Sequence, residues 1–578
     1  MTSLHDEIRR SCQQPVIELP RRAAQELHFV ISGDDDLVCV CQMLAARGAA
    51  LCTIVANDER LLEDHAFKIY YVLAAQTGEL VILEHALHAL AHYVSIRDSF
   101  PAAEPLEHEI GDLFGLTPTN KPVTRHYLLH EVYPEDLYPL RPRRTLERLK
   151  ETIRKYLLNR PLPPTLPPAL PAGMTRQTVG PIHAELIEAG QFIIEGAGEP
   201  MEQLSLRPGY KHRGIEKMFE TNYTLEHGWQ LAERISGDSS FSHALAYCQA
   251  VEALAGIEPP APAHFWRGLL LELERLYNHI ADVGAVMHDI GLDLVASDLA
   301  VLREQALRLN QRLTGQRLLR GVNRLGGVVL PPAPDLAEVQ RDVDTLATQF
   351  LELGGVVLRM QSCRVRFVNV GILTEAEVRR TGATGLMARA AGLIAHDVRL
   401  RDQHGVFAHD SALRHELLAT VTPNAQRPSE IKRRVPVFQR DMRGDSFARL
   451  ALRIAEVETS ARIIALLLDH LRAFDSAAPC VVPASEVARL LRQTPNSEFG
   501  LGYVENWRGD LCYWVMKGAG NTIRRCKVRD PSIFNWPAFA LAVMPKIGAD
   551  GRPTQGNMLS DFPLINRSCN LSYAGRDG

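Results

Sequence analysis

Short strand-like segments surround one helical segment in the first 145 residues. Runs of β-branched and aromatic residues, which favour extended backbone, are LHFVIS (27–32), ALCTIVAND (50–58) and KIYYVLAA (68–75), with AHYVSI (91–96) as a weaker candidate. Three aspartates open DDDLVCVCQMLAARG (34–48), and acidic residues in a first turn favour a helix there. The mixture predicts a small α+β domain.

Long amphipathic helices follow residue 175. In FWRGLLLELERLYNHIADVGAVMHDIG (265–291), apolar side chains recur at spacings of three and four residues, which predicts one buried helix face. Segments 297–315, 335–353 and 446–474 repeat this pattern. Near the end of the chain, GYVENWRGDLCYWVMKG (502–518) and NTIRRCKVRD (521–530) are typical of a β-hairpin.

A proline-rich segment, RPLPPTLPPALPAG (160–173), separates these two patterns. Its six prolines exclude a helix or a central strand, and a basic helix is predicted just before it, over 144–160. A long surface loop would also fit, but the change of pattern favours a linker. We expect an N-terminal domain over 1–145, a helix and linker over 146–174, and a large domain over 175–578.

Composition narrows the class of protein. The chain has 578 residues, of which 46% are apolar and 23% charged, and its net charge of −4 argues against nucleic acid as a partner. No segment approaches 18 uninterrupted apolar residues, so no membrane span is expected. The first residues show no signal-peptide pattern, and we expect a reducing compartment with free, mostly buried thiols. The ten cysteines include no CxxC, the usual local signature of zinc knuckles and iron–sulfur clusters.

Generic motifs give little further guidance. No phosphate-binding GxxxxGKS or GxxxxGKT is present, and neither GAGEP (196–200) nor GAGNT (518–522) completes GxGxxG. His85, His88 and His92 would share a face if their segment were helical and would then suit a metal. The segment could equally be a strand, and solvated or core histidines are the commoner case. The arginine runs at 141–145 and 431–436 fit either acidic partners or solvated faces.

Several segments resemble one protein family. GPIHAELIEAGQFIIEGAGEPMEQLSLRPGYKHRGIEKMFE (180–220) resembles the start of the large subunits shared by respiratory complex I and energy-converting nickel–iron hydrogenases. EPLEHEIGDLFGL (104–116) and YPEDLYPLRP (133–142) resemble the adjacent small complex I subunit, which is fused in this order in the formate hydrogenlyase type. The resemblance implies an α+β fold in which a small domain precedes a large, mainly helical domain. That large domain would have a β-rich hairpin at its start and strands near its end.

The family's metal ligands are missing from the matching positions. The hydrogenases bind nickel and iron through four thiolates from two CxxC motifs, and a hydroxyl or apolar side chain does not replace this soft ligand. In ERISGDSSFSH the first pair falls on Ser236 and Ser239, and in DFPLINRSCNLSYAGRDG the second falls on Leu571 and Ala574, to within one or two residues. Cys569 is the only thiol nearby. The resemblance therefore implies that this chain holds no nickel–iron site.

Other family positions suggest a second chemistry. In complex I, a quinone headgroup binds between a histidine of the first β-hairpin and a tyrosine. His212 of GYKHRGIEK matches the histidine, whereas Gly237 stands at the tyrosine position. A quinone site at His212 is therefore an alternative, with the missing phenol as its main difficulty.

Three further sets of residues match family positions. Glu216 matches a proton-passing glutamate, and a desolvated carboxyl there would have a raised pKa; an ion pair with Arg213 or Lys217 is the alternative. Arg508 matches an arginine beside the hydrogenase iron, with Trp507 replacing a proline, or else pairs with Glu505. Glu109 and Asp112 match a motif with a role in docking and folding.

The resemblance implies a redox-arm subunit without a nickel–iron site that couples electron transfer to proton or ion movement, with Glu216, His212 and Arg508 as its site residues. The expected partners are an iron–sulfur small subunit with a 4Fe-4S cluster, antiporter-like membrane subunits and a membrane anchor, at the cytoplasmic face of the inner membrane. A complex I-like quinone reductase module and a non-catalytic scaffold are the alternatives.

Overall fold

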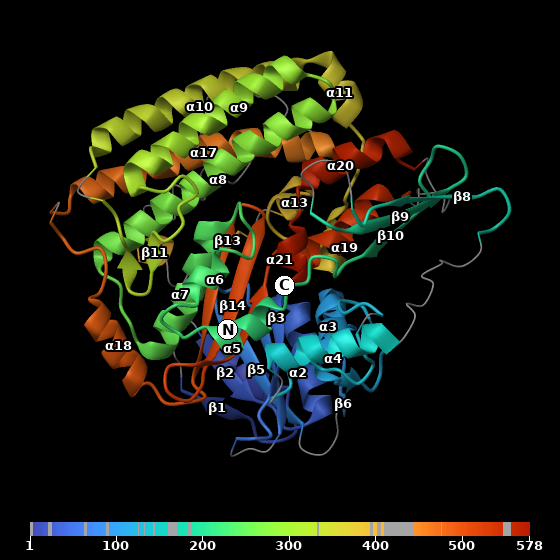
Figure 1. The fold of residues 1–578 in the computed structure, drawn as a ribbon, viewed down its shortest axis with the longest axis vertical. Helices are drawn as coiled ribbons and strands as arrows, with labels where there is room; N and C mark the ends of the chain where they lie inside the picture. Colours follow the sequence, from blue (N-terminus) through green and yellow to red (C-terminus); the bar gives the residue numbers. More distant parts are fainter. Residues whose placement is uncertain are drawn as a thin grey trace.

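The computed structural model is a mixed α+β fold (Figure 1). It describes residues 4–20, 26–62, 66–87, 92–124, 126–131, 133–142, 145–159, 170–182, 188–331, 334–393, 397–400, 406–409, 443–475, 477–546 and 556–578. Most of the proline-rich segment and the arginine run at 431–436 lie outside these residues, so their predicted roles stay predictions.

The N-terminal part is built on a five-stranded sheet of order β1-β2-β5-β4-β3, in which only β2 and β5 run parallel. Helices α2 and α3 contribute apolar side chains to the core on one face of the sheet. The elements of this part are α1 (Leu4–Arg10), β1 (Ile17–Leu19), β2 (Glu26–Val30), α2 (Asp34–Ala46), β3 (Ala50–Asp58), β4 (Phe67–Ala74), β5 (Leu80–Leu87), β6 (His92–Tyr93), α3 (Glu104–Phe114), β7 (Thr117–Pro118) and α4 (Leu146–Asn159).

The other face of this sheet packs on a second sheet from the far end of the chain. Strands β13 (Phe499–Asn506), β14 (Gly509–Lys517) and β15 (Ile523–Arg529) form an antiparallel meander. Tyr70 of β4 and Trp514 of β14 lie in the shared core, with ring centroids 5.0 Å apart. The Arg529 guanidinium also donates to the carbonyl oxygen of Cys52, at 2.5 Å. The two parts of the chain therefore share a buried core.

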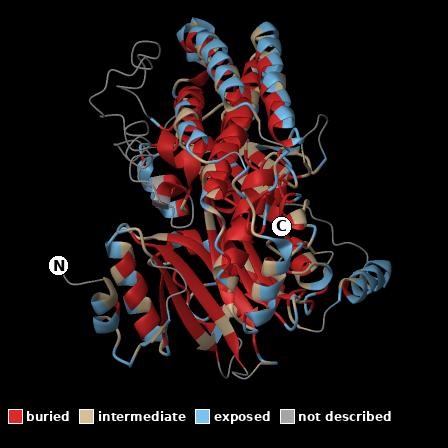
Figure 2. Ribbon diagram, turned by 90° about the vertical axis from the view of Figure 1, so that its left-hand side faces the viewer, coloured by how far each residue is buried: buried red, intermediate tan, exposed pale blue. Residues whose placement is uncertain are grey.

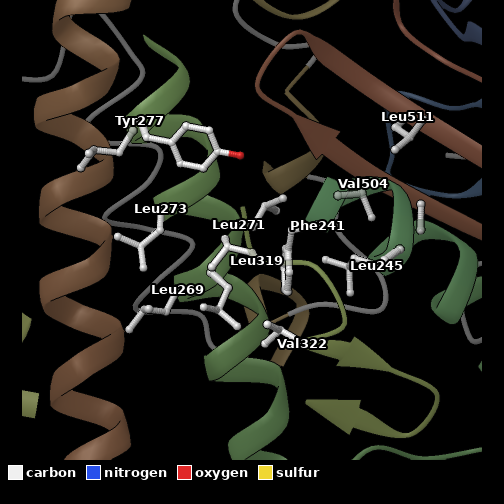
Figure 3. Close-up of a cluster of buried hydrophobic side chains, with 14 of the residues drawn as sticks. Phe241, Leu245, Leu269, Leu271, Leu273, Tyr277, Leu319, Val322, Val504 and Leu511 are labelled. Carbon is white, nitrogen blue, oxygen red and sulfur yellow. The ribbon is translucent and has the colours of Figure 1, made fainter. Parts of the chain in front are cut away.

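Long helices form the largest core, on the other side of the meander. Figure 3 shows this core: Phe241 and Leu245 of α7 and Leu269, Leu273 and Tyr277 of α8 pack with Val504 and Leu511 of the meander. Helices α9 and α10 lie at the top of Figures 1 and 2 and expose one side to solvent. The elements are α7 (Ser240–Ala255), α8 (Ala261–Asp289), α9 (Asp293–Thr314), α10 (Leu336–Arg359), α11 (Gln361–Phe367) and α17 (Ser446–Arg472).

A smaller sheet and several short helices complete the fold. The sheet has the order β10-β9-β8 and packs on α19 through a cluster centred on Phe192 and Trp536. The remaining elements are β8 (Thr175–Val179), β9 (Gln191–Gly196), β10 (Gln203–Arg207), α5 (Ile215–Asn222), α6 (Trp229–Ala232), β11 (Asn323–Arg324), β12 (Gly327–Val328), α12 (Glu375–Thr381), α13 (Gly385–Ala390), α14 (Val406–His409), α18 (Ala484–Gln493), α19 (Ser532–Val543), α20 (Phe562–Cys569) and α21 (Tyr573–Asp577).

Several predicted elements need correction. His85 lies in β5, a central strand of the first sheet, so it cannot share a helical face with His92; His88 lies outside the described residues. The His85 ring instead hydrogen-bonds to the Ile31 carbonyl oxygen and to Asp34. The predicted hairpin is part of a three-stranded meander, and the helices Ser532–Val543, Phe562–Cys569 and Tyr573–Asp577 follow it. The candidate strand at 91–96 is only two residues long.

None of the helices in the described ranges combines the length and apolar character needed to cross a membrane.

Close packing of α7 on β13 depends on two glycines, and it gives a first prediction. A Cβ atom at Gly502 would overlap the carbonyl oxygen of Ala246, and a Cβ at Gly500 would overlap that of Ala250. We expect Gly502→Ala to lower the free energy of unfolding by about 3 kcal/mol, because the helix and strand must separate. Thermal unfolding followed by circular dichroism measures the effect. Gly33→Ala is the matched control, since its nearest atom would lie 3.5 Å away; equal unfolding temperatures for the two variants would contradict the packing argument.

Candidate functional site

The turn between β13 and β14 carries the first candidate residue, Arg508. Its backbone N–H donates to the Asn506 side chain at 2.8 Å, which fixes the turn. The guanidinium makes a two-pronged ion pair with Asp238, at 2.6 and 2.8 Å, and its Nε donates to the carbonyl oxygen of Asn570 at 2.6 Å. Arg508 therefore joins the turn to the loop before α7 and to the segment 570–578. The predicted alternative of a pair with Glu505 is wrong, because Glu505 binds Arg389 instead.

Hydroxyl groups surround this ion pair. Ser236 Oγ lies 3.0 Å from Ser572 Oγ and donates to Asp238 at 2.9 Å. Ser239 Oγ accepts a hydrogen bond from the Trp507 indole at 3.0 Å. The predicted ligand positions Ser236 and Ser239 are thus brought to the same place as Arg508.

The structure places Ser572, rather than the predicted Leu571 or Ala574, against Ser236. Leu571 and Ala574 are buried, and Leu571 packs in the apolar cluster around Phe192. Ser572 is the residue that faces Ser236, and a spacing of three then places the next position at Gly575. A Cβ atom at Gly575 would overlap the Asp530 carboxylate, so a larger side chain does not fit there unless Asp530 moves.

The side-chain atoms at this site that could bind a metal are oxygens. Burial would raise the pKa of Asp238, but the Arg508 guanidinium outweighs it and lowers the pKa to about 2, so the carboxylate is ionised. Cys569 is buried among apolar side chains rather than beside Ser236. Within the described ranges, no three His, Cys, Asp or Glu side chains are placed to hold a metal. This oxygen set does not match the four thiolates of a nickel–iron centre.

Segment 570–578 also positions His212. The His212 Nδ1 lies 2.6 Å from the carbonyl oxygen of Asp577, and the neighbouring backbone N–H of Lys211 donates to the Asp577 carboxylate at 2.9 Å. His212 lies between β10 and α5, outside the first hairpin, so its match to a hairpin histidine is not supported by its place in the fold. His212 and Glu216 line the same cavity of about 30 Å³.

Glu216 is held in a buried ionic network that links α5 to β15. Its carboxylate lies 2.7 Å from Arg525 and 3.1 Å from Lys527, and Lys527 also pairs with Glu109 of α3. Burial raises the pKa of Glu216, but Arg525 and Lys527 reverse the effect and lower it. The predicted raised pKa is therefore wrong. Glu216 does form ion pairs, as predicted, but with Arg525 and Lys527. The predicted partner Lys217 pairs with Glu220 instead.

Asp112 holds a loop rather than a site. Its carboxylate accepts backbone N–H groups of His126, Leu128 and Leu129 at 2.8 to 3.1 Å. Together with the Glu109–Lys527 pair, this gives both residues of the N-terminal motif contacts within the fold, and the docking role stays a prediction.

A second, larger cavity opens beside these groups. It has a volume of about 440 Å³ and lies between α3, the β8–β10 sheet, α19 and α21. Phe192, Trp536 and Tyr573 give it an apolar lining, and Arg576 and Asp577 line both this cavity and the small one that contains His212. A cavity of this size and character suits an aromatic or aliphatic small molecule.

Comparisons with known proteins show which family the chain belongs to. Residues 30–148 match the family described as respiratory-chain NADH dehydrogenase, 30 Kd subunit, and residues 289–417 match its 49 Kd subunit. The membrane-bound hydrogenase subunit alpha of Pyrococcus furiosus is 30% identical over 66% of this chain and 82% of its own length. The chain belongs to the family of the complex I 49 kDa and membrane-bound hydrogenase large subunits.

Further relatives extend over nearly the whole chain. Formate hydrogenlyase subunit 5 of Escherichia coli is 29% identical over 92% of this chain and 85% of its own length, and hydrogenase-4 component G is 28% identical over 91% and 83%. Family membership thus covers both the 30 kDa-like and the 49 kDa-like regions. A solved structure titled as the membrane-bound sulfane sulfur reductase, an archaeal respiratory membrane complex, has the same fold, with a TM-score of 0.58 and 24% identity over 71% of this chain and 100% of its own.

The sequence did not identify Asp238, Ser572 and Asp577 as site residues. Asp238 lies inside the quoted segment ERISGDSSFSH, and an acidic residue between two ligand positions was the available signal for a partner to Arg508. Ser572 and Asp577 depend on the path of segment 570–578, which no local pattern indicates.

The ionic network of Glu216 gives a prediction about pH. A carboxyl with a lowered folded-state pKa stabilises the protein above its unfolded pKa and loses that effect as pH falls through the folded value. We expect Glu216→Gln to cost about 3 kcal/mol at neutral pH and much less below about pH 4. Unfolding temperatures measured across this range test it.

Glu220→Gln is the matched control, because burial raises the pKa of Glu220. Because this carboxyl has a raised pKa, its contribution to the free energy of unfolding of the wild type falls as pH rises. The unfolding temperature of Glu220→Gln should therefore rise relative to that of the wild type toward neutral pH. The same pH dependence in both variants would contradict the assignment of Glu216.

Proposed function

We propose that this chain is the peripheral large subunit of a membrane-bound, complex I-like redox complex, that it works without a nickel–iron site, and that it couples electron transfer to proton or ion movement. The observation that carries the proposal is the Arg508–Asp238 ion pair with the Ser236, Ser239 and Ser572 hydroxyls, which stands where the family's thiolates would lie. Oxygen donors around a paired guanidinium suit hydrogen bonding to a polar group, whereas nickel needs soft ligands.

The partners follow from the family. The relatives are named as subunits of formate hydrogenlyase, membrane-bound hydrogenase and NADH-quinone oxidoreductase. We propose an iron–sulfur small subunit with a 4Fe-4S cluster as electron donor, antiporter-like membrane subunits, and a membrane-anchor subunit that holds the chain at the cytoplasmic face of the inner membrane. The side chain of Asp238 is 38% exposed, so a polar group from solvent or from a partner can reach it.

The metal content of the assembled complex tests this proposal. The complex is purified through a tag on this chain from cells grown with added nickel, and its iron and nickel are measured. We expect iron from the partner cluster and no stoichiometric nickel, because the ligand positions offer only oxygen. A nickel-containing membrane-bound hydrogenase prepared in the same way is the control. One nickel per complex would overturn the proposal.

A quinone reductase module is the second candidate, and the cavity of about 440 Å³ favours it. An apolar cavity that shares Asp577 and Arg576 with the His212 cavity would place the ring of a quinone near a proton donor. Arg525 and Lys527 lower the pKa of Glu216, so its carboxylate is not a proton donor.

Turnover with a short-chain quinone distinguishes this candidate from a scaffold. If quinone is reduced here, His212→Gln should lower turnover at least tenfold, and Ala540→Phe, which fills the cavity, should raise the KM. His227→Gln alters an exposed histidine outside both cavity linings and should leave both constants unchanged. Full turnover in all three variants would rule out quinone chemistry at this site, and an assembled complex without redox turnover would indicate a scaffold.

A further inference from the structure

A cluster of charged side chains is buried in the helical core, apart from the site described above. It lies where α8, α13, α17, β13 and the segment 397–400 meet, and each member is at most 6% exposed. We call it the buried carboxylate cluster. Its members are Glu272, Arg275, His279, Arg389, Asp397, Arg399, Glu456 and Glu505.

Ion pairs connect the whole cluster. Arg389 lies 2.6 Å from Glu505 and 2.7 Å from Glu456. Arg399 lies 2.7 Å from Asp397 and 2.8 Å from Glu272, and Arg275 lies 3.3 Å from Glu272. The groups therefore share their charge as one unit rather than as separate pairs.

The charges in this cluster do not balance. Four carboxylates face three guanidinium groups, and the neighbouring Arg453 is already paired with Asp282 at 2.8 Å. Burial lowers the pKa of His279, so its ring is neutral and does not supply the missing positive charge. An uncompensated charge in a dry interior is costly, and the usual remedy is to bind a proton.

The Glu505 carboxyl is available to hold that proton. Burial, followed by the charge of Asp397, raises the pKa of Glu505 to about 7. The neutral His279 ring donates from Nε2 to Glu456 at 2.7 Å, and its Nδ1 has no hydrogen-bond partner among the described residues. An unprotonated ring nitrogen without a donor is a free acceptor.

A small cavity lies beside Glu505. Its volume is about 20 Å³, enough for one water molecule. Glu505, Arg399 and Gln249 line it, and the buried Gln249 Oε1 has no hydrogen-bond partner in the described part of the chain. A water molecule there would have Gln249 and Glu505 among its lining groups, and the Glu505 oxygens also accept from Arg389 and from the backbone N–H of Val398.

We propose that the buried carboxylate cluster is a proton-binding site that holds one exchangeable proton on Glu505, with the His279 Nδ1 left as a hydrogen-bond acceptor in the same cluster. This assignment does not depend on the proposed redox function. The site lies directly behind the turn that carries Arg508, because Arg275 donates to the carbonyl oxygens of Glu505 and Asn506 at 2.9 and 3.5 Å, and the His279 ring lies edge-on to Trp507. Proton binding therefore changes the charge beneath the candidate site.

Infrared spectroscopy of the full chain, labelled with 13C at glutamate carboxyls, tests the proposal. As pH falls from about 9 to about 5, the wild type should gain the carbonyl stretch of protonated glutamic acid. Burial also raises the pKa of Glu233 and Glu274 to about 7, so the band of Glu505 is isolated by subtracting the spectra of Glu505→Gln from those of wild type. We expect this difference to contain one carboxyl that titrates near neutral pH.

Glu258→Gln is the matched control, since Glu258 is exposed, and it should leave the wild-type band unchanged near neutral pH. Asp397→Asn provides an independent second variant, which also serves if Glu505→Gln fails to fold. It removes the excess charge without altering Glu505, so the band should shift to lower pH. The proposal is overturned if the Glu505 difference spectrum is empty over this range, or if Asp397→Asn leaves the midpoint where it is in wild type.

Discussion

Buried guanidinium groups hold this structure together. Arg529 joins the meander to the first sheet, Arg508 joins the meander to the loop before α7 and to segment 570–578, and Arg525 joins β15 to α5 and to the carbonyl oxygen of Ala56. A guanidinium group stays charged at any physiological pH, so each buried arginine needs several acceptors. These acceptors come from segments hundreds of residues apart, and this requirement fixes how the two regions of the chain fit together.

The same requirement explains which parts could be predicted from sequence. The pattern in 265–291 predicted α8 correctly, because apolar spacing is local information. The segment of β5 around His85 was left open between helix and strand, since Glu84 and His85 interrupt its apolar residues and have their partners on other elements. Tertiary contacts outweighed local pattern there.

The site residues also divide into those that local motifs indicate and those that depend on tertiary contacts. The motifs around Ser236, Ser239 and Arg508 located three groups that the fold brings together. The partners of Glu216 lie on β15, more than 300 residues away, so its local neighbours Arg213 and Lys217 were misleading. The position of Ser572 opposite Ser236 depends on a turn at Asn570, whose backbone is left-handed with φ of 43°, and no spacing rule could supply that register.

The hydroxyl and carboxylate oxygens around Arg508 have a consequence for chemical durability. Thiolates at an accessible site pass through sulfenic and sulfinic acids when oxidants reach them, and the later steps are irreversible. Serine hydroxyls and an ionised aspartate paired with arginine undergo none of these reactions. The Asp238, Ser236 and Ser239 oxygens can therefore meet oxygen or peroxide without such a loss.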